Sequence, residues 1–249
     1  MIVTKNKYVL HYHQKSKNRK NEKARFDGRF FLIGKRLFDI TASLLISVLV
    51  LSWLIPILAI LIKLDSKGPV FFVQTRIGFL GIPFRCYKLR TMVVNEDSDS
   101  KQAVANDARI TRLGHFLRIT SLDELPQFLN VLIGNMSIVG PRPFMTKDDQ
   151  DFSIVVSNYP LRYCAKPGIS GMAQVKGYRG RTEDFHSIFH RYQWDTYYVR
   201  NARPSLDFKI LRLTVVQIIK SIFAAKIIKR EEVERFSNSD AKFLLKNLR

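Results

Sequence analysis

The chain has 249 residues, of which 46% are hydrophobic, so it can form one sizeable domain or two small ones around a packed core. Its 41 Lys and Arg residues against 21 Asp and Glu residues give a net charge of +20. This excess predicts a polyanionic partner: nucleic acid, an anionic lipid surface or a phosphorylated substrate. The two cysteines, Cys86 and Cys164, are far apart, which argues against a disulfide framework or a thiolate zinc site and fits a reducing cytoplasm.

The first segment, residues 1–32, is expected to be a basic tail. It is too long and too polar for the charged region of a signal peptide, and no cleavage pattern of small residues follows the apolar run behind it.

Residues 40–62 form an uncharged run, ITASLLISVLVLSWLIPILAILI, that is long enough to cross a bilayer core, which takes about 20 residues. A buried core helix, a single span and a re-entrant helix are the alternatives. Both flanks are basic, whereas a spanning helix carries its Lys and Arg excess on the cytoplasmic side only. Pro56 should kink the helix, and Ser52 could hydrogen-bond a freed backbone group. We therefore predict a re-entrant membrane helix over residues 33–64.

The rest of the chain predicts an α+β fold: a β-hairpin and several amphipathic helices around a small catalytic core, residues 65–205. Two β-rich runs, residues 70–77 and 83–90, flank a glycine-bounded turn and predict the hairpin. Residues 95–106 are expected to form a loop, and residues 109–119 and 182–200 are expected to form helices. Residues 166–180 are expected to form a glycine-rich loop. Residues 206–249 are expected to form a C-terminal amphipathic helix with its tail.

An acidic pair lies in the stretch SLDELPQ, residues 121–127, within this basic chain. If Asp123 is an N-cap, Pro126 falls in the first helical turn, where its missing N–H costs nothing. Asp123 and Glu124 are then expected at a helix N-terminus, which lowers the pKa of a carboxyl group. Helix capping alone would explain such residues, and so would a nucleophile or metal ligand.

Cationic residues near the pair favour chemistry over capping. They are Arg118, Arg142 between two prolines, and Lys88 and Arg90 at the end of the predicted hairpin. Arginine binds phosphate oxygens in a bidentate manner, and carboxylates among arginines suit magnesium-dependent phosphoryl transfer. We predict substrate binding by Lys88, Arg90, Arg118 and Arg142.

The strings KRLFDI, FVQTRIG, YKLRTM, LRITSLDELPQFLNVLIGNMSIVGPRP, KPGISGMAQVKGYRG and WDTYYV resemble the bacterial sugar transferases, which are monotopic phosphoglycosyl transferases. The resemblance covers residues 33–220 and is greatest to the undecaprenyl-phosphate glucose phosphotransferases. It implies transfer of a sugar-1-phosphate from a UDP-sugar to polyprenyl phosphate, with release of UMP, as the first step of exopolysaccharide, capsule, O-antigen or glycan assembly.

The same resemblance implies the roles of individual residues and the location. Asp123 would be the nucleophile of a covalent phosphosugar intermediate, and Glu124 would be its partner at the metal or in proton handling. Mg2+ would be the cofactor, with Asp123 and Glu124 as its ligands. Arg118 and Arg142 would bind phosphate or the uridine diphosphate. The protein would lie on the cytoplasmic face of the bacterial inner membrane, against anionic lipid, and would supply downstream glycosyltransferases.

Two other classes are weighed against this interpretation. A membrane-anchored nucleic-acid-binding protein would use the basic tail, but no recognised nucleic-acid module occurs in the sequence, so no nucleic-acid partner is expected. A catalytically inactive membrane scaffold would not need the intact Asp123–Glu124 pair.

The two basic flanks generate a prediction about topology. Single cysteines introduced on either side of residues 40–62 should be labelled by an impermeant reagent from the same side of the membrane, because both flanks favour the cytoplasm. Labelling of the two flanks from opposite sides would show a single span.

Overall fold

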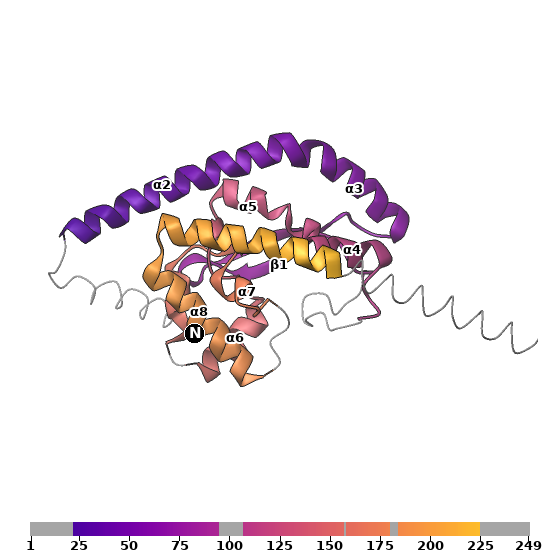
Figure 1. The fold of residues 1–249 in the computed structure, drawn as a ribbon. Helices are drawn as coiled ribbons and strands as arrows, with labels where there is room; N and C mark the ends of the chain where they lie inside the picture. Colours follow the sequence, from indigo (N-terminus) through magenta and orange to yellow (C-terminus); the bar gives the residue numbers. More distant parts are fainter. Residues whose placement is uncertain (1–21, 95–106, 157, 180–183, 225–249) are drawn as a thin grey trace, which may run out of the picture.

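The computed structural model describes residues 22–94, 107–156, 158–179 and 184–224. A long bent helix forms an arch over the rest of the protein (Figure 1). Its limbs are α2 (Glu22–Ile46) and α3 (Ser52–Asp65), joined by a π turn at Ser47–Leu51. The expected basic tail lies largely outside the described residues, and α2 begins before residue 33, where the membrane helix was expected.

The bend in the arch lies at the π turn, and the hydrogen bonds of that turn explain it. The Ser52 N–H bonds the carbonyl of Ser47, five residues earlier, and so leaves the Val48 carbonyl without its usual partner. The Ser52 hydroxyl donates to that carbonyl at 2.5 Å, and Trp53 Nε1 donates to the Leu49 carbonyl at 2.8 Å. Ser52 thus bonds a freed carbonyl, as expected. The bend was expected at Pro56, but Pro56 lies inside α3, and the bend lies at the π turn before that helix.

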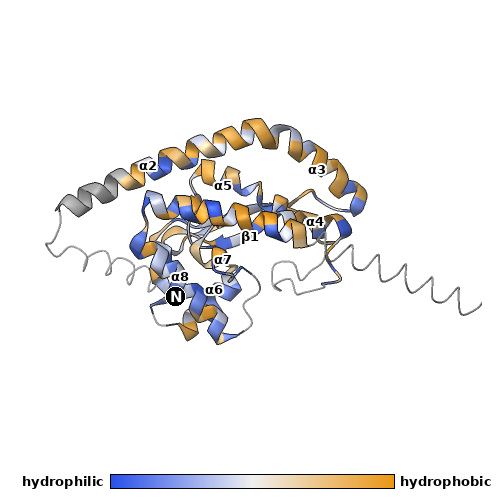
Figure 2. Ribbon diagram, viewed as in Figure 1, coloured by the Kyte–Doolittle hydropathy of each residue, from blue (hydrophilic) through white to orange (hydrophobic). Residues whose placement is uncertain are grey.

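The arch is long and apolar, little of it is buried in the protein, and its two limbs do not pack against each other as a hairpin would. The helix over Phe31–Asp65 is, by length and composition, capable of crossing a membrane, and it is the one such helix in the described ranges. Only 17% of its most apolar window is buried in the protein, and hydrophobic residues run along it (Figure 2). The two limbs diverge from the bend, so the structure does not confirm a closed re-entrant hairpin.

Beneath the arch lie two small sheets. Strands β1 (Phe71–Ile77) and β2 (Pro83–Leu89) pair antiparallel with Phe71 opposite Leu89, which confirms the predicted hairpin. Strand β3 (Ser137–Val139) pairs parallel with β4 (Gly168–Ser170). The glycine-rich segment expected to be a loop therefore contains a strand, followed by the one-turn helix α7 (Met172–Val175).

The remaining helices surround these sheets. They are α4 (Arg112–Thr120), α5 (Gln127–Ile133), α6 (Thr146–Val155), α8 (Phe185–Asn201) and a helix over residues 204–224, with a 3₁₀ segment at Tyr159–Cys164. Helices α4 and α8 confirm two predicted helices. The C-terminal helix buries Leu206 and Ile210 in the main core, so this part packs on the protein. The expected loop over residues 95–106 and the tail beyond residue 224 lie outside the described residues.

Polar side chains fasten both limbs of the arch to the protein below. Arg36 of α2 donates to the carbonyls of Val131 and Leu132 at 2.7 and 3.1 Å, at the C-terminus of α5. A cation at this end of a helix is also favoured by the helix dipole. Buried Asp39 accepts a hydrogen bond from the Ile138 N–H at 3.0 Å, so the α2 limb is tied to both α5 and β3.

The α3 limb is fastened by Arg90. Its guanidinium donates to the carbonyls of Lys67, Ser66 and Ile62 at 2.5, 2.6 and 3.2 Å. These carbonyls lie in the last turn of α3 and just after it, and the Ile62 carbonyl also accepts from the Ser66 N–H at 3.2 Å. Gly68 gives Arg90 the room to reach them, because a Cβ at Gly68 would come within 2.0 Å of the Arg90 guanidinium.

Asn130 joins α5 to the hairpin. Its side chain is fully buried, donates to the Arg85 carbonyl at 2.7 Å and accepts from the Tyr87 N–H at 3.0 Å. The amide therefore satisfies the outer edge of β2 as another strand would. Strand β2 carries Lys88, so this contact also fixes the position of a predicted site residue.

Replacing Asn130 with Ala should lower the free energy of unfolding by about 2–4 kcal/mol, because two backbone groups of β2 lose their partner. Unfolding followed by circular dichroism in detergent measures the loss. The matched control is Asn201→Ala, which removes one exposed bond to the Tyr197 carbonyl and should cost less than about 0.5 kcal/mol. Equal small losses for both variants would contradict the role assigned to Asn130.

Candidate active site

A cavity of about 530 Å3 lies between the β-hairpin, the 3₁₀ turn before α5 and the loop that leads into α6. All six residues predicted for the site line it: Lys88, Arg90, Arg118, Asp123, Glu124 and Arg142. The structure therefore brings together residues that are far apart in the sequence. It adds three arginines that the sequence analysis did not assign, Arg76, Arg179 and Arg191. Two of them belong to the strings FVQTRIG and KGYRG, which carried the family resemblance.

The acidic pair lies in a 3₁₀ turn, Leu122–Glu124, between α4 and α5. Ser121 ends α4 in the left-handed conformation, with φ of 59°, and turns the chain so that both carboxylates enter the protein. The prediction that Asp123 is a helix N-cap is wrong, because α5 begins later and its N-cap is Pro126. Asp123 and Glu124 are only 8% and 6% exposed.

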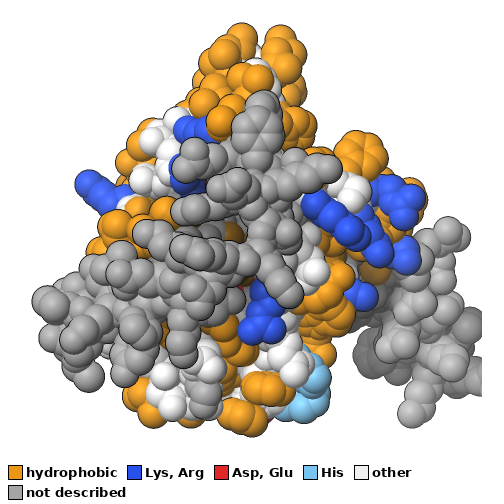
Figure 3. Space-filling view, turned by 90° about the vertical axis from the view of Figure 1, so that its left-hand side faces the viewer, with side chains coloured by type: hydrophobic (Ala, Val, Ile, Leu, Met, Phe, Trp, Pro, Cys, Tyr) orange, Lys and Arg blue, Asp and Glu red, His pale blue; other side chains and the backbone are white. Residues whose placement is uncertain are grey.

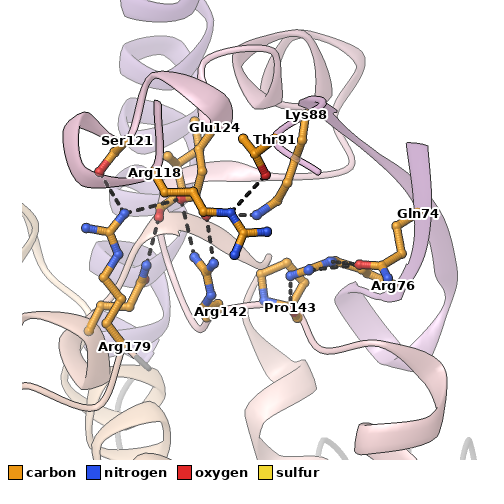
Figure 4. A network of polar contacts seen from close by, with 12 residues as sticks. Gln74, Arg76, Lys88, Thr91, Arg118, Ser121, Glu124, Arg142, Pro143 and Arg179 are labelled. Carbon is orange, nitrogen blue, oxygen red and sulfur yellow. Dashed lines mark hydrogen bonds and ion pairs between the residues drawn. The ribbon is translucent and has the colours of Figure 1, made fainter. Parts of the chain in front are cut away.

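Glu124 is surrounded by cations, which converge on it from different elements (Figure 4). Its Oε1 lies 2.9 Å from Lys88 Nζ and 2.7 Å from Arg142 Nη2, and its Oε2 accepts from Arg142 Nη1 at 3.3 Å. Arg179 Nη2 lies 4.0 Å from Oε2 and donates to the Ser121 hydroxyl at 2.7 Å. Burial would raise the pKa of Glu124, but Arg142 and Lys88 outweigh it and hold the pKa well below the usual value. Glu124 is therefore a fixed anion.

Asp123 differs from its neighbour. In the described part of the chain, its carboxylate forms no hydrogen bond and no ion pair. Burial raises its pKa against the attraction of Lys88, and the negative charge of Glu124 raises it further. The lowered pKa expected from a helix N-terminus is therefore wrong for Asp123. The residue lines the cavity.

Arg118 and Arg142 lie on different sides of the pair. Arg118, in the last turn of α4, donates through Nε to the Thr91 hydroxyl at 2.8 Å, which leaves the end of its guanidinium in the cavity. Arg142 comes from the Pro141–Pro143 loop, which restricts its backbone.

Two further arginines hold this loop. The carbonyl of Arg142 accepts from Arg162 Nη2 at 2.5 Å, and the carbonyl of Pro143 accepts from Arg76 Nη1 at 2.8 Å. Arg162 is buried and paired with Asp195 at 2.9 Å. Hydrogen bonds to the carbonyl of Arg142 and to the next carbonyl therefore hold the backbone of this loop in place.

Arg90 has a different environment from the other predicted cations. It lines the cavity, but its Nη1 and Nη2 atoms bond the three carbonyls at the end of α3. Its role in substrate binding remains a prediction, while its contact with the arch is a structural fact.

The carboxylates of the cavity are candidate ligands for Mg2+. The described residues contain no group of three or more His, Cys, Asp and Glu side chains that could hold a metal alone. Mg2+ in phosphoryl-transfer sites is commonly held by one or two carboxylates together with substrate phosphates. The adjacent carboxylates of Asp123 and Glu124 fit that arrangement. Glu124 is already ion-paired with Lys88 and Arg142, whereas Asp123 has no ion pair with any described residue.

Comparison with known proteins agrees with the geometry. Residues 30–221 match the family model described as bacterial sugar transferase. A UDP-glucose:undecaprenyl-phosphate glucose-1-phosphate transferase of Klebsiella pneumoniae is 45% identical over 185 residues, which cover 74% of this chain and 40% of that protein. The exopolysaccharide production protein PSS of Rhizobium leguminosarum bv. phaseoli is 44% identical over 190 residues, which cover 74% of this chain and 94% of that protein.

A third relative differs in the sugar that its name gives. It is a UDP-N-acetylgalactosamine-undecaprenyl-phosphate N-acetylgalactosaminephosphotransferase of Aeromonas hydrophila, 40% identical over 187 residues, which cover 74% of this chain and 43% of that protein. The chain spans about 40% of the length of the first relatives it matches. The resemblance found in the sequence motifs is confirmed by the family match over most of the chain. The chain belongs to the bacterial sugar transferase family.

Proposed function

We propose that the protein transfers a sugar-1-phosphate from a UDP-sugar to polyprenyl phosphate, giving polyprenyl-diphosphate-sugar and UMP. One observation supports this most directly: Asp123, whose carboxylate has no hydrogen-bonding partner among the described residues, lines a cavity together with Lys88, Arg118, Arg142 and Arg179. Such a cavity neutralises phosphate charge next to a nucleophile. The names of the relatives from Klebsiella pneumoniae and Aeromonas hydrophila describe transfers of this kind.

The chemistry divides into two steps at one phosphorus atom. In the first, an Asp123 oxygen bonds the phosphorus that carries the sugar, the bond from that phosphorus to the bridging oxygen breaks, and UMP leaves with the electron pair. In the second, a phosphate oxygen of the acceptor lipid bonds the same phosphorus and the bond to Asp123 breaks. When Asp123 is ionised, neither attacking oxygen carries a proton, so neither step needs a general base, and the second step regenerates the carboxylate.

The fixed charges of the site give each neighbour a role. Glu124 holds Lys88 and Arg142 so that their positive charges face the reacting phosphates. Arg118 is placed on the opposite side by Thr91 and would bind a second phosphate oxygen. Asp123 and Glu124, together with the donor diphosphate, would hold Mg2+, which when bound supplies further charge neutralisation at the phosphates.

The same proposal places the protein on the cytoplasmic face of a bacterial inner membrane, with the arch inserted and the site at lipid-phosphate depth. Arg36 and Arg90 fasten the two limbs to the same folded unit, which supports an arrangement with both flanks on one side. Hydrophobic side chains cover the arch at the top of Figure 3, and Lys and Arg side chains lie below it, where anionic lipid headgroups would meet them. The product would pass to downstream glycosyltransferases of exopolysaccharide, capsule, O-antigen or glycan assembly.

An inactive membrane scaffold is the alternative, and enzymatic assay separates the two. Purified protein in detergent should release UMP from at least one UDP-sugar, and removal of divalent cations by a chelator should stop the release. A panel of UDP-sugars also identifies the donor. Absence of UMP with every donor and added Mg2+ would favour the scaffold.

Replacing Asp123 with Asn should abolish transfer, with a loss of at least about 10³-fold, because the nucleophilic oxygen is lost. Mass spectrometry of the wild type with donor alone should show a phosphosugar adduct on the peptide that carries Asp123, and the variant should show none. Asp151→Asn, at an exposed position on α6, is the matched control and should retain activity. Substantial turnover by the Asp123 variant would overturn the assignment.

Replacing Arg142 with Lys should raise the KM for the UDP-sugar by about tenfold or more, because lysine lacks the planar fork that binds phosphate and Glu124 together. Steady-state UMP release at varied donor concentration measures the effect. Arg203→Lys, at an exposed position, should leave the KM unchanged. An unaltered donor KM in the Arg142 variant would count against donor binding by this residue.

A further inference from the structure

A pair of histidines lies on α8, and neither of them lines the cavity. His186 and His190 are four residues apart, so their imidazoles lie on the same side of the helix. Their Nε2 atoms approach to 2.9 Å. Within the described residues, neither Nε2 atom has another hydrogen-bond or ion-pair partner. The chemistry proposed for the cavity leaves both side chains without a role.

The helix that carries the pair is held in place at its beginning and along its buried side. The N-cap Asp184 accepts from the Ser187 N–H at 2.7 Å. Ile188 and Tyr192 pack against a buried cluster beneath α8, and the Tyr192 hydroxyl donates to the Asn158 carbonyl at 3.0 Å. A fixed backbone holds the two imidazoles together before any ligand arrives, which lowers the entropic cost of binding.

Two imidazole nitrogens that converge in this way suit a divalent transition metal. Zn2+ binds His nitrogens at about 2.0–2.1 Å, which places two nitrogens of a tetrahedral site about 3.3 Å apart. The observed 2.9 Å reaches that separation after a small side-chain movement. At 2.9 Å one ring donates a proton from Nε2 to the other ring. Metal binding moves this proton to Nδ1 of the same ring, so that both Nε2 lone pairs face the metal.

This pair differs in chemistry from the carboxylates of the cavity. Imidazole suits Zn2+, Cu2+ and Ni2+, whereas Mg2+ prefers oxygen ligands. The described residues supply no third His, Cys, Asp or Glu ligand, so water would complete the coordination. The positive end of the helix dipole opposes a cation here, and the exposed carboxylate of Asp184 offsets it.

Tyr178 connects the histidine pair to the active site. Its ring stacks on His190, with the ring centroids 5.5 Å apart and the planes at 21°. The next residue, Arg179, donates to the Ser121 hydroxyl and lies 4.0 Å from Glu124. A bound metal gives the His190 ring positive charge, and a positive charge is attracted to the face of an aromatic ring. Metal binding should therefore strengthen the stack and hold Tyr178 and its neighbour in place.

We propose that His186 and His190 form a binding site for a divalent transition metal such as Zn2+, and that the bound metal holds Tyr178 and Arg179 beside the cavity. The metal site is independent of the proposed function, while its effect on substrate binding through Arg179 rests on that function. The chain would then carry two cation sites with different ligands, one of imidazoles and one of carboxylates.

Titration of Zn2+ into the full chain, without a histidine tag and with excess Mg2+, tests the site. Calorimetry should show Zn2+ binding that His186→Asn and His190→Asn each weaken at least about tenfold, because one of two protein ligands is lost. The matched control His115→Asn removes an exposed histidine from α4 and should leave the affinity unchanged.

The electron paramagnetic resonance spectrum of bound Cu2+ gives a second measurement of the same site. It should show coupling to two imidazole nitrogens in the wild type and to one in each α8 variant. Circular dichroism should show that the variants fold. Absence of Zn2+ binding by the wild type, or equal binding by the wild type and both α8 variants, would overturn the proposal.

Linkage tests the connection through Tyr178. Tyr178→Leu should lower the Zn2+ affinity about two- to fivefold, because the stack on His190 is lost. The matched control Tyr197→Leu, at an exposed position on α8, should keep the wild-type affinity. Zn2+ should slow hydrogen exchange at residues 176–179 in the wild type and not in His190→Asn. Equal affinity in the Tyr178 variant with unchanged exchange would overturn the connection to Arg179.

Kinetics then separate this proposal from the proposed function. With excess Mg2+, added Zn2+ should lower the KM for the UDP-sugar at least about twofold in the wild type, because Arg179 is held at the cavity, and should not do so in His186→Asn. If no UDP-sugar yields UMP while Zn2+ still binds the pair, the transferase function fails and the metal site stands. Normal UMP release without Zn2+ binding would remove the site and leave the function.

Discussion

The arrangement of the site depends on one buried carboxylate. Glu124 accepts from Lys88 and Arg142, with Arg179 nearby, so strand β2, the proline-bounded loop and the segment after α7 converge on it. Without this anion, three cations would face each other in a mostly buried cavity, and their repulsion would open it. The same pairing fixes Glu124, whereas the adjacent Asp123 has no ion pair with any described residue, so neighbouring residues of one short turn acquire different chemistry.

That site is held by contacts that also position the arch. Arg90 directly follows β2, the strand that carries Lys88, and it donates to the carbonyls at the end of α3. Asn130 joins the same strand to α5. Arg36 then ties α5 to α2. Continuous hydrogen bonding thus connects the apolar helix to the acidic pair through β2 and α5. The distance between the cavity and the arch is therefore fixed, because β2 and α5, which lie between them, are each held by hydrogen bonds.

Sequence patterns predicted the local elements and the members of the site better than they predicted its geometry. Alternating β-rich runs around glycine identified the hairpin, and the string from Arg118 to Arg142 identified the carboxylates and their cations. The pattern failed where tertiary contacts override local preference. Ser121 adopts a left-handed conformation that moves Asp123 out of the N-cap, and burial reverses the expected direction of its pKa. The role of Arg90 at α3 depends on Gly68 and could not be read from spacing.

The bend at Ser47–Leu51 has a consequence for the membranes in which such a protein can work. A helix that spans a bilayer must match the thickness of the hydrocarbon region, and mismatch costs energy for each ångström. An arch whose two limbs are fastened to one folded unit by Arg36 and Arg90 has a depth set by its own curvature instead. If the arch inserts as proposed, the π turn would make insertion depth a property of the protein, and bilayers of different thickness would present the lipid phosphate at the same level.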